Sequence, residues 1–103
     1  MRVTAEQIQL FDAYAQRHFG EDAVCWLFGS RVDDSKKGGD YDFLIETSLR
    51  DADEIIDQKI ALLVGLQGTP QFEDEKVDIV VKRRFSTFKM PIYEIAMREG
   101  VRI

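Results

Sequence analysis

Cysteine, proline and long apolar runs are all scarce in this sequence of 103 residues. The single cysteine, Cys25, excludes an internal disulfide and argues against a thiolate zinc site, because both need more than one cysteine. No apolar run approaches the ~20 residues of a membrane span, and the N-terminus lacks the apolar stretch of a secretory signal. With two prolines and no Gly/Ser-rich linker, nothing marks a domain boundary. We therefore expect one domain over residues 1–103, cytoplasmic and without a membrane partner.

Basic residues are also in the minority. Lysine and arginine number 14 against 19 aspartates and glutamates, which leaves a formal net charge of −5. An acidic surface repels phosphate polymers, so direct binding of DNA or RNA is not expected. A single nucleotide is still compatible with this charge, because a bound metal ion can neutralise its phosphates.

Apolar periodicity predicts three helices and up to four strands. Thr4 and Gln7 form a capping-box pattern ahead of apolar residues at helical spacing, and short apolar runs mark the strands. The expected elements are a helix over 5–19, strands over 23–28 and 40–46, a helix capped by Ser48 or Asp51, a strand over 76–82, a helix from Pro91 and a short strand over 101–103. A short helix could also begin at Ser30. This alternation predicts a single sheet covered by helices.

Two of these helices should each bury one apolar face. In the second helix the residues expected to face inward are Ile55, Ile56, Ile60, Leu62, Leu63 and Leu66. In the last helix they are Ile92, Ile95 and Ala96. The intervening segment "GTPQFEDE" is expected to be a loop.

Three aspartates stand where apolar residues would otherwise be expected. Asp40 and Asp42 open the second strand, and the alternation of side chains along a strand puts both on one face. Asp78 lies inside the third strand, on the face opposite to its apolar neighbours. If the two strands are adjacent, the three carboxylates converge. Clustered carboxylates repel one another unless a cation lies between them, and Mg²⁺ prefers such oxygen ligands.

The segment Gly29-Ser30-Arg31 is the natural partner of these acids. It follows a buried strand, glycine allows a ligand to approach the backbone, and a helix N-terminus offers free N–H groups to phosphate. The Ser30 hydroxyl adds a donor, and Arg31 can pair with a phosphate or with an acid. The basic run Lys82-Arg83-Arg84 either contacts a nucleotide or an acidic partner or is simply solvated.

Taken together, "LFGSR", "GGDYDFLIE" and "VDIVV" resemble the minimal nucleotidyltransferases of the DNA polymerase β-like superfamily. The resemblance covers nearly the whole chain. It implies an α/β fold of the α+β type with a mixed sheet, and two Mg²⁺ ions held by Asp40, Asp42 and Asp78. It further implies that Gly29 and Ser30 bind the triphosphate of ATP or another nucleoside triphosphate, and that Asp78 helps to activate the acceptor hydroxyl.

The same resemblance suggests a partner and a biological role. Many minimal nucleotidyltransferases are antitoxins that add AMP to a hydroxyl of a helical HEPN-type toxin, and the expected function here is this protein AMPylation. Asp33 and Asp34 depart from the family pattern, as does Gly39, which stands where a serine often precedes the first acid. The alternative function is a non-catalytic module that neutralises its partner by docking alone.

Overall fold

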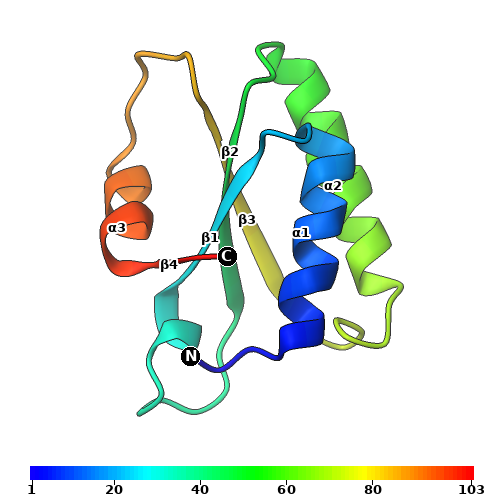
Figure 1. The fold of residues 1–103 in the computed structure, drawn as a ribbon, viewed down its shortest axis with the longest axis vertical. Coiled ribbons are helices and arrows are strands. Elements are labelled where there is room, and N and C mark those ends of the chain that lie inside the picture. The colour runs from blue at the N-terminus through cyan, green and yellow to red at the C-terminus, as the bar shows by residue number, and fades with distance from the viewer.

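A mixed four-stranded sheet forms the centre of the protein, as described by a computed structural model covering residues 1–103 (Figure 1). The elements are α1 (Ala5–Phe19), β1 (Val24–Phe28), a 3-10 helix η1 (Gly29–Val32), β2 (Tyr41–Thr47), α2 (Ala52–Gln67), β3 (Val77–Arg83), α3 (Pro91–Glu99) and β4 (Val101–Arg102). The strand order is β3-β2-β1-β4, in which only the β2–β3 pair is parallel. The expected α+β fold with one helix-covered mixed sheet is therefore confirmed.

Local sequence signals explain where the helices begin. The Thr4 side chain accepts a hydrogen bond from the Gln7 backbone N–H, and the Gln7 side chain reciprocates at Thr4 in a complete capping box. Two residues were candidates for the N-cap of the second helix. Asp51 is the N-cap, and its side chain accepts hydrogen bonds from backbone N–H groups of the next turn. Pro91 occupies the first turn of α3, where its missing N–H costs nothing. No helix is long and apolar enough to cross a membrane.

The main core lies between the sheet and the helix pair α1/α2. Phe11 of α1 stacks on Phe43 of β2 with ring centroids 3.7 Å apart, and both side chains are fully buried. Phe72 belongs to the loop predicted after α2, yet it is fully buried and packs edge-on against Phe43. Burial raises the pKa of the Cys25 thiol to about 12, with Asp12 adding to the effect, so the lone cysteine is an unreactive core residue.

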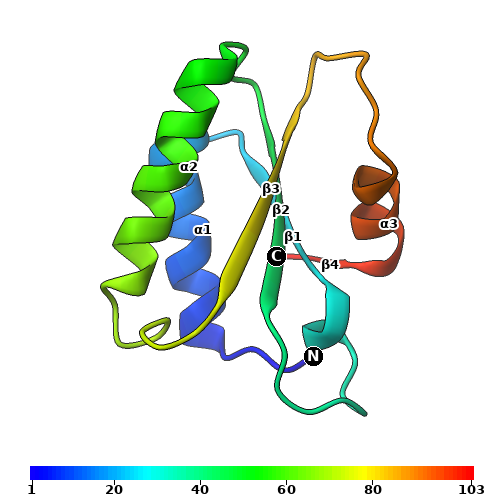
Figure 2. The ribbon, with the colours of Figure 1, turned by 180° about the vertical axis from the view of Figure 1, so that it is seen from behind.

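The opposite face of the sheet carries α3 and a much smaller core. Phe28, Leu44 and Ala96 are buried there, with Trp26 and Tyr93 partly buried against them. Both views of the ribbon show α3 on the side away from the α1/α2 pair (Figures 1 and 2). Because α3 has only nine residues, much of this face is left uncovered.

Several expectations are corrected by the structure. β2 and β3 each begin and end one residue later than predicted, so Asp40 lies just before its strand. Ile56 and Ile60 were expected inside but are 54% and 56% exposed. They point away from α1 because the α1-facing side of α2 is the one that carries Gly65, where an added Cβ would meet Tyr14. Ile95 on α3 is also exposed, since the short helix buries only Ala96 fully.

Candidate active site

The register of β2 and β3 brings two of the three aspartates together. Asp42 is directly opposite Asp78 in the parallel β2–β3 pair, so the two side chains share a face of the sheet. Their neighbours along the strands, Leu44 and Val80, belong to the small core under α3, which places the acids on the α3 side. Asp40 lies two residues before Asp42, immediately outside the strand.

The electrostatics of the cluster centre on Asp42. Partial burial raises the pKa of its carboxyl, and the negative charges of Asp78 and Asp40 raise it further, with Lys76 acting in the opposite sense. The charges of Asp78 and Asp40 therefore both disfavour the charged form of Asp42. A cation placed among them would relieve this repulsion.

A lysine already supplies part of that positive charge. The Lys76 Nζ lies 3.4 Å from a carboxylate oxygen of Asp40. The hydrogen bond to Asp40 raises the pKa of Lys76, as do the charges of Asp40, Asp78 and Asp42. Since the ammonium group is exposed, this pair contributes little to stability, but it occupies an Asp40 oxygen that a metal ion would need.

The glycine turn after β1 packs directly onto the acids. Gly29 has φ of +76°, and a Cβ at this position would collide with the Asp42 carboxylate. Gly39 has φ of +94°, and a Cβ there would collide with the Ser30 hydroxyl. Both positions therefore require glycine for two reasons, backbone conformation and the space left for a neighbouring side chain. The predicted residues Gly29, Ser30, Asp40 and Asp42 are thus gathered at one end of the sheet.

An open cleft of about 590 Å³ begins at this turn. Its walls include Gly29, Ser30 and Lys36, together with Asp33, Asp34 and Glu99. The volume is sufficient for part of a nucleotide. The three acids, against one lysine, make the cleft unattractive to a bare triphosphate, so a ligand of this kind would have to bring cations with it.

The Arg31 side chain is not directed at the three aspartates. Its guanidinium lies over the Tyr41 ring, 4.1 Å from the ring centroid, and donates to the Gly39 carbonyl at 3.2 Å. The guanidinium also donates to the Arg2 carbonyl at 3.4 Å and forms a weak pair with Glu75 at 3.9 Å. The structure therefore engages Arg31 in holding the loop against the α1/α2 side of the sheet, and does not bring it to the aspartates.

Arg2 is a residue that sequence reasoning missed. Its guanidinium donates to the carbonyls of Ser30 and Gly38, both at 2.7 Å, and to the carbonyl of Asp33 at 3.1 Å. One side chain thus ties together the turn after β1 and the loop that leads to Asp40. No local pattern reveals this role, because the bonded residues lie 28 to 36 positions away in the sequence.

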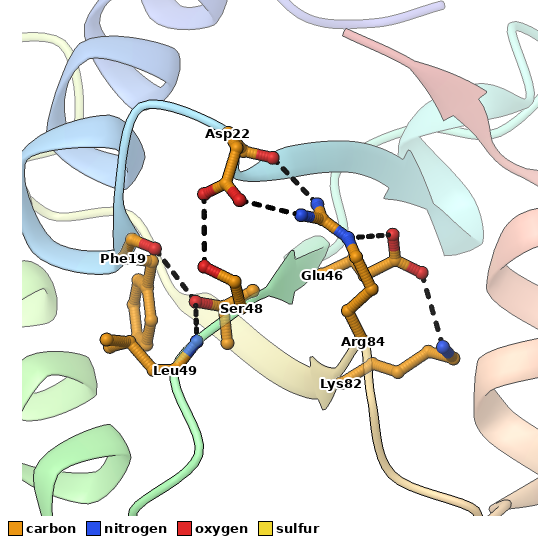
Figure 3. A network of polar contacts seen from close by, with 8 residues as sticks. Phe19, Asp22, Glu46, Ser48, Leu49, Lys82 and Arg84 are labelled. Atoms are coloured by element: carbon orange, nitrogen blue, oxygen red, sulfur yellow. Dashed lines mark hydrogen bonds and ion pairs between the residues drawn. The ribbon is translucent and has the colours of Figure 1, made fainter.

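The side chains of the basic run Lys82-Arg83-Arg84, at the end of β3, form contacts with other residues of the protein. Lys82 and Arg84 both pair with Glu46, at 3.2 and 3.1 Å, and Arg84 also pairs with Asp22 at 2.8 Å (Figure 3). Burial alone would raise the pKa of Glu46, but the hydrogen bonds from Arg84 and Lys82 lower it. This network connects β2, β3 and the segment before β1, and Arg83 donates to the Arg50 carbonyl at 3.2 Å, so all three basic side chains make contacts within the protein.

The donor chemistry at the site suits a hard divalent cation, because carboxylate oxygens are the ligands that Mg²⁺ prefers. In the arrangement present, however, no group of three histidine, cysteine, aspartate or glutamate side chains is placed to hold one ion. Asp40 would have to leave Lys76 for the three aspartates to act together. The strand register fits a metal site, and the side-chain positions would have to adjust to complete it.

Comparisons with protein-family models and with curated proteins found no match for this chain. The resemblance to minimal nucleotidyltransferases therefore stays a hypothesis that depends on the motifs and on the site geometry.

Proposed function

We propose that this protein is a Mg²⁺-dependent nucleotidyltransferase that transfers a nucleoside monophosphate, AMP from ATP in the simplest case, to a hydroxyl of a partner protein. The observation that carries the proposal is the register of Asp42 against Asp78, beside a glycine turn that leaves no room for a side chain at Gly29. A purely structural strand pair gains nothing from two facing carboxylates, which repel each other.

Each residue has a defined role in this proposal. Asp40, Asp42 and Asp78 would hold two Mg²⁺ ions, whose chemistry is to neutralise the phosphates and stabilise charge on the reacting oxygens. Gly29 and Ser30 would offer backbone and hydroxyl donors to the triphosphate. Asp78 would accept the proton of the acceptor hydroxyl. The acceptor oxygen then bonds to the α-phosphorus, the bond from that phosphorus to the bridging oxygen breaks, and pyrophosphate leaves.

The partner in this proposal is a helical HEPN-type toxin, and the protein is the antitoxin that AMPylates it in the cytoplasm. Support comes from the resemblance of the motifs to those of the minimal nucleotidyltransferases.

A second function, neutralisation by docking without catalysis, is favoured by one specific observation. Ile56, Ile60 and Val64 are spaced four residues apart on α2 and are 54%, 56% and 69% exposed. A stripe of this kind is typical of a protein contact surface. A protein that neutralises its partner by docking alone would not require the three aspartates.

Co-expression with the product of the neighbouring gene, followed by intact mass measurement of that product, tests the two functions. We expect a nucleoside monophosphate adduct with the parent and none with Asp42→Asn or Asp78→Asn. Asp57→Asn, which removes an exposed acid of α2, serves as the matched control and should leave the adduct in place. A partner that stays unmodified yet is neutralised by the parent and by Asp42→Asn alike would establish the docking function instead.

A further inference from the structure

The protein has an apolar surface that its own elements leave exposed. Two hollows connect its parts, because Ile56 and Phe88 line one hollow with Tyr93, and Met90 and Met97 line a second hollow with the same tyrosine. Further apolar side chains continue from Ile56 along α2 at four-residue spacing. The six large side chains of this surface are 40% to 69% exposed: Ile56, Ile60, Val64, Phe88, Met90 and Met97. They present roughly 500 Å² of apolar surface, which is large for a protein without a partner.

The two halves of this surface carry opposite charges. The second hollow is a groove of about 560 Å³ along α3, and three bases line it against a single acid: Lys82, Lys89 and Arg98. Lys89 takes part in no ion pair. The start of α2 is acidic, since three exposed acids without ion pairs come before its first base, Lys59: Asp51, Asp53 and Glu54. The exposed side of α2 thus has the two properties that complement the groove, apolar side chains and negative charge.

Both halves lie on the same side of the molecule. Figure 2 shows β3, in yellow, at the edge of the sheet, with α2 on one side of it and α3 on the other. In this view α2 begins at the end of the molecule where β3 finishes, and α3 lies at the height of the middle of α2. A second copy, turned by 180° about an axis parallel to this edge, would therefore place its α2 against α3 of the first copy and its α3 against α2, at matching heights.

We propose that this surface binds a second copy of the same chain in a two-fold symmetric dimer, with α2 of each copy in the α3 groove of the other. Ile60 packs against Met90 and Met97 of the second copy. Asp53, nearer the start of α2, faces Lys89 of the second copy. The apolar side chains supply more than half of the roughly 800 Å² per partner that a stable interface buries. This inference does not depend on the nucleotidyltransferase function, and it assigns the exposed stripe of α2 to a different occupant than the docking function does.

Analytical ultracentrifugation of the full chain, without nucleotide or metal, tests the dimer. We expect a monomer–dimer equilibrium with a Kd of about 1–50 µM. Ile60→Asp should weaken association about tenfold or more, because it brings a charge into the apolar contact. Ile95→Asp is the matched control, since Ile95 is an exposed apolar residue of α3 that does not line the groove. A chain that stays monomeric up to about 200 µM, or equal effects of the two substitutions, would overturn the proposal.

Charge reversal tests which segments meet. Asp53→Lys and Lys89→Glu should each weaken self-association about three- to tenfold at low salt, because each creates two like-charge contacts in the dimer. A 1:1 mixture of these two variants should recover the parent's association, since both contacts of the mixed dimer again join opposite charges. Arg17→Glu, on α1, changes the net charge as Lys89→Glu does and is the control. If Asp53→Lys associates no better with Lys89→Glu than with Arg17→Glu, α2 does not lie in the α3 groove and the proposal is wrong.

The product of the neighbouring gene is the competing occupant of this surface. If the chain is monomeric by itself, and that product binds it in a way that Ile60→Asp abolishes, the surface belongs to the other protein and the dimer is excluded. If the dimer forms and is disrupted by Ile60→Asp but not by Asp42→Asn, the surface is an interface between two copies. That result stands whether or not the transfer experiment succeeds, because association is measured without nucleotide or metal.

Discussion

The two faces of the sheet differ in what covers them. On the α1/α2 side, thirteen buried residues form one continuous core. On the α3 side only three residues form a buried cluster, and the aspartates lie on this face without belonging to that cluster. Burial of apolar side chains stabilises the α1/α2 side of the sheet. On the α3 side, repulsion among the aspartates is tolerated because water still solvates their carboxylates. On the same strands, the residues that stabilise the fold therefore lie on one face of the sheet, and the residues proposed for the chemistry lie on the other.

Adjacent residues of β2 make the sharpest test of this division. Phe43→Ala removes a fully buried ring that stacks on Phe11 and touches Phe72. We expect it to lower the free energy of unfolding by about 3–5 kcal/mol, measured by urea denaturation. Asp42→Asn, one residue away on the other face, should leave that free energy nearly unchanged. A Phe43→Ala variant as stable as the parent would show that the main core does not lie where the structure places it.

The glycine turn should be the most sensitive point on the acid side. Gly29→Ala forces a side chain into a positive-φ position and into the Asp42 carboxylate, so we expect a loss of about 2–3 kcal/mol by the same measurement. Gly38→Ala is the matched control: its φ is +61°, but nothing lies within 4 Å of an added Cβ. It should cost only about 1 kcal/mol of backbone strain. Equal costs for both variants would mean that the Asp42 contact is unimportant.

Lys76 should compete with a metal ion for Asp40. Lys76→Met removes the ammonium group that lies 3.4 Å from the Asp40 carboxylate, so the acids should bind Mg²⁺ about three- to tenfold more tightly. The thermal midpoint should then rise further with added MgCl₂ than it does in the parent. Lys59→Met, on α2, controls for the loss of a positive charge. A Mg²⁺ response unchanged by Lys76→Met would exclude this competition.

The smallest expected effect is on the pH dependence of stability. Because the folded-state pKa of Asp42 is raised above the ordinary value of 3.8, the folded chain holds that proton more tightly than the unfolded chain does. This contribution to stability therefore falls as the pH rises from 3.8 to the folded-state pKa, and Asp42→Asn lacks it.

In metal-free buffer the stability of Asp42→Asn relative to the parent should improve across that window and then level off, and because solvent screens the partly exposed carboxyl the gain should be about 0.5 kcal/mol or less. Urea denaturation at a series of pH values measures the difference. If the stability of the variant relative to the parent declined with rising pH instead, the sign of the Asp42 pKa shift would be wrong.

Much of the fold was predictable because its signals are local. The capping box at Thr4 and Gln7 places the start of α1, and Pro91 and Gly100 bracket α3. Strand alternation also predicted that Asp42 and Asp78 would share a face once β2 and β3 were neighbours, and the register confirms this. Family membership, the metal ions and the acceptor remain predictions.

The sequence by itself determined which segments form helices and strands, since caps, prolines and apolar spacing act over a few residues. Only the tertiary structure decided which apolar residues are covered. Ile56 and Ile60 fit the apolar face of α2 as well as Leu62 does, yet α1 and the sheet contact only one side of that helix. In the same way, Arg2 holds the loop before Asp40, and Arg31 turns away from the acids, because folding brings distant carbonyls and the Tyr41 ring within their reach. Such contacts depend on the paths of several segments at once, which no local pattern encodes.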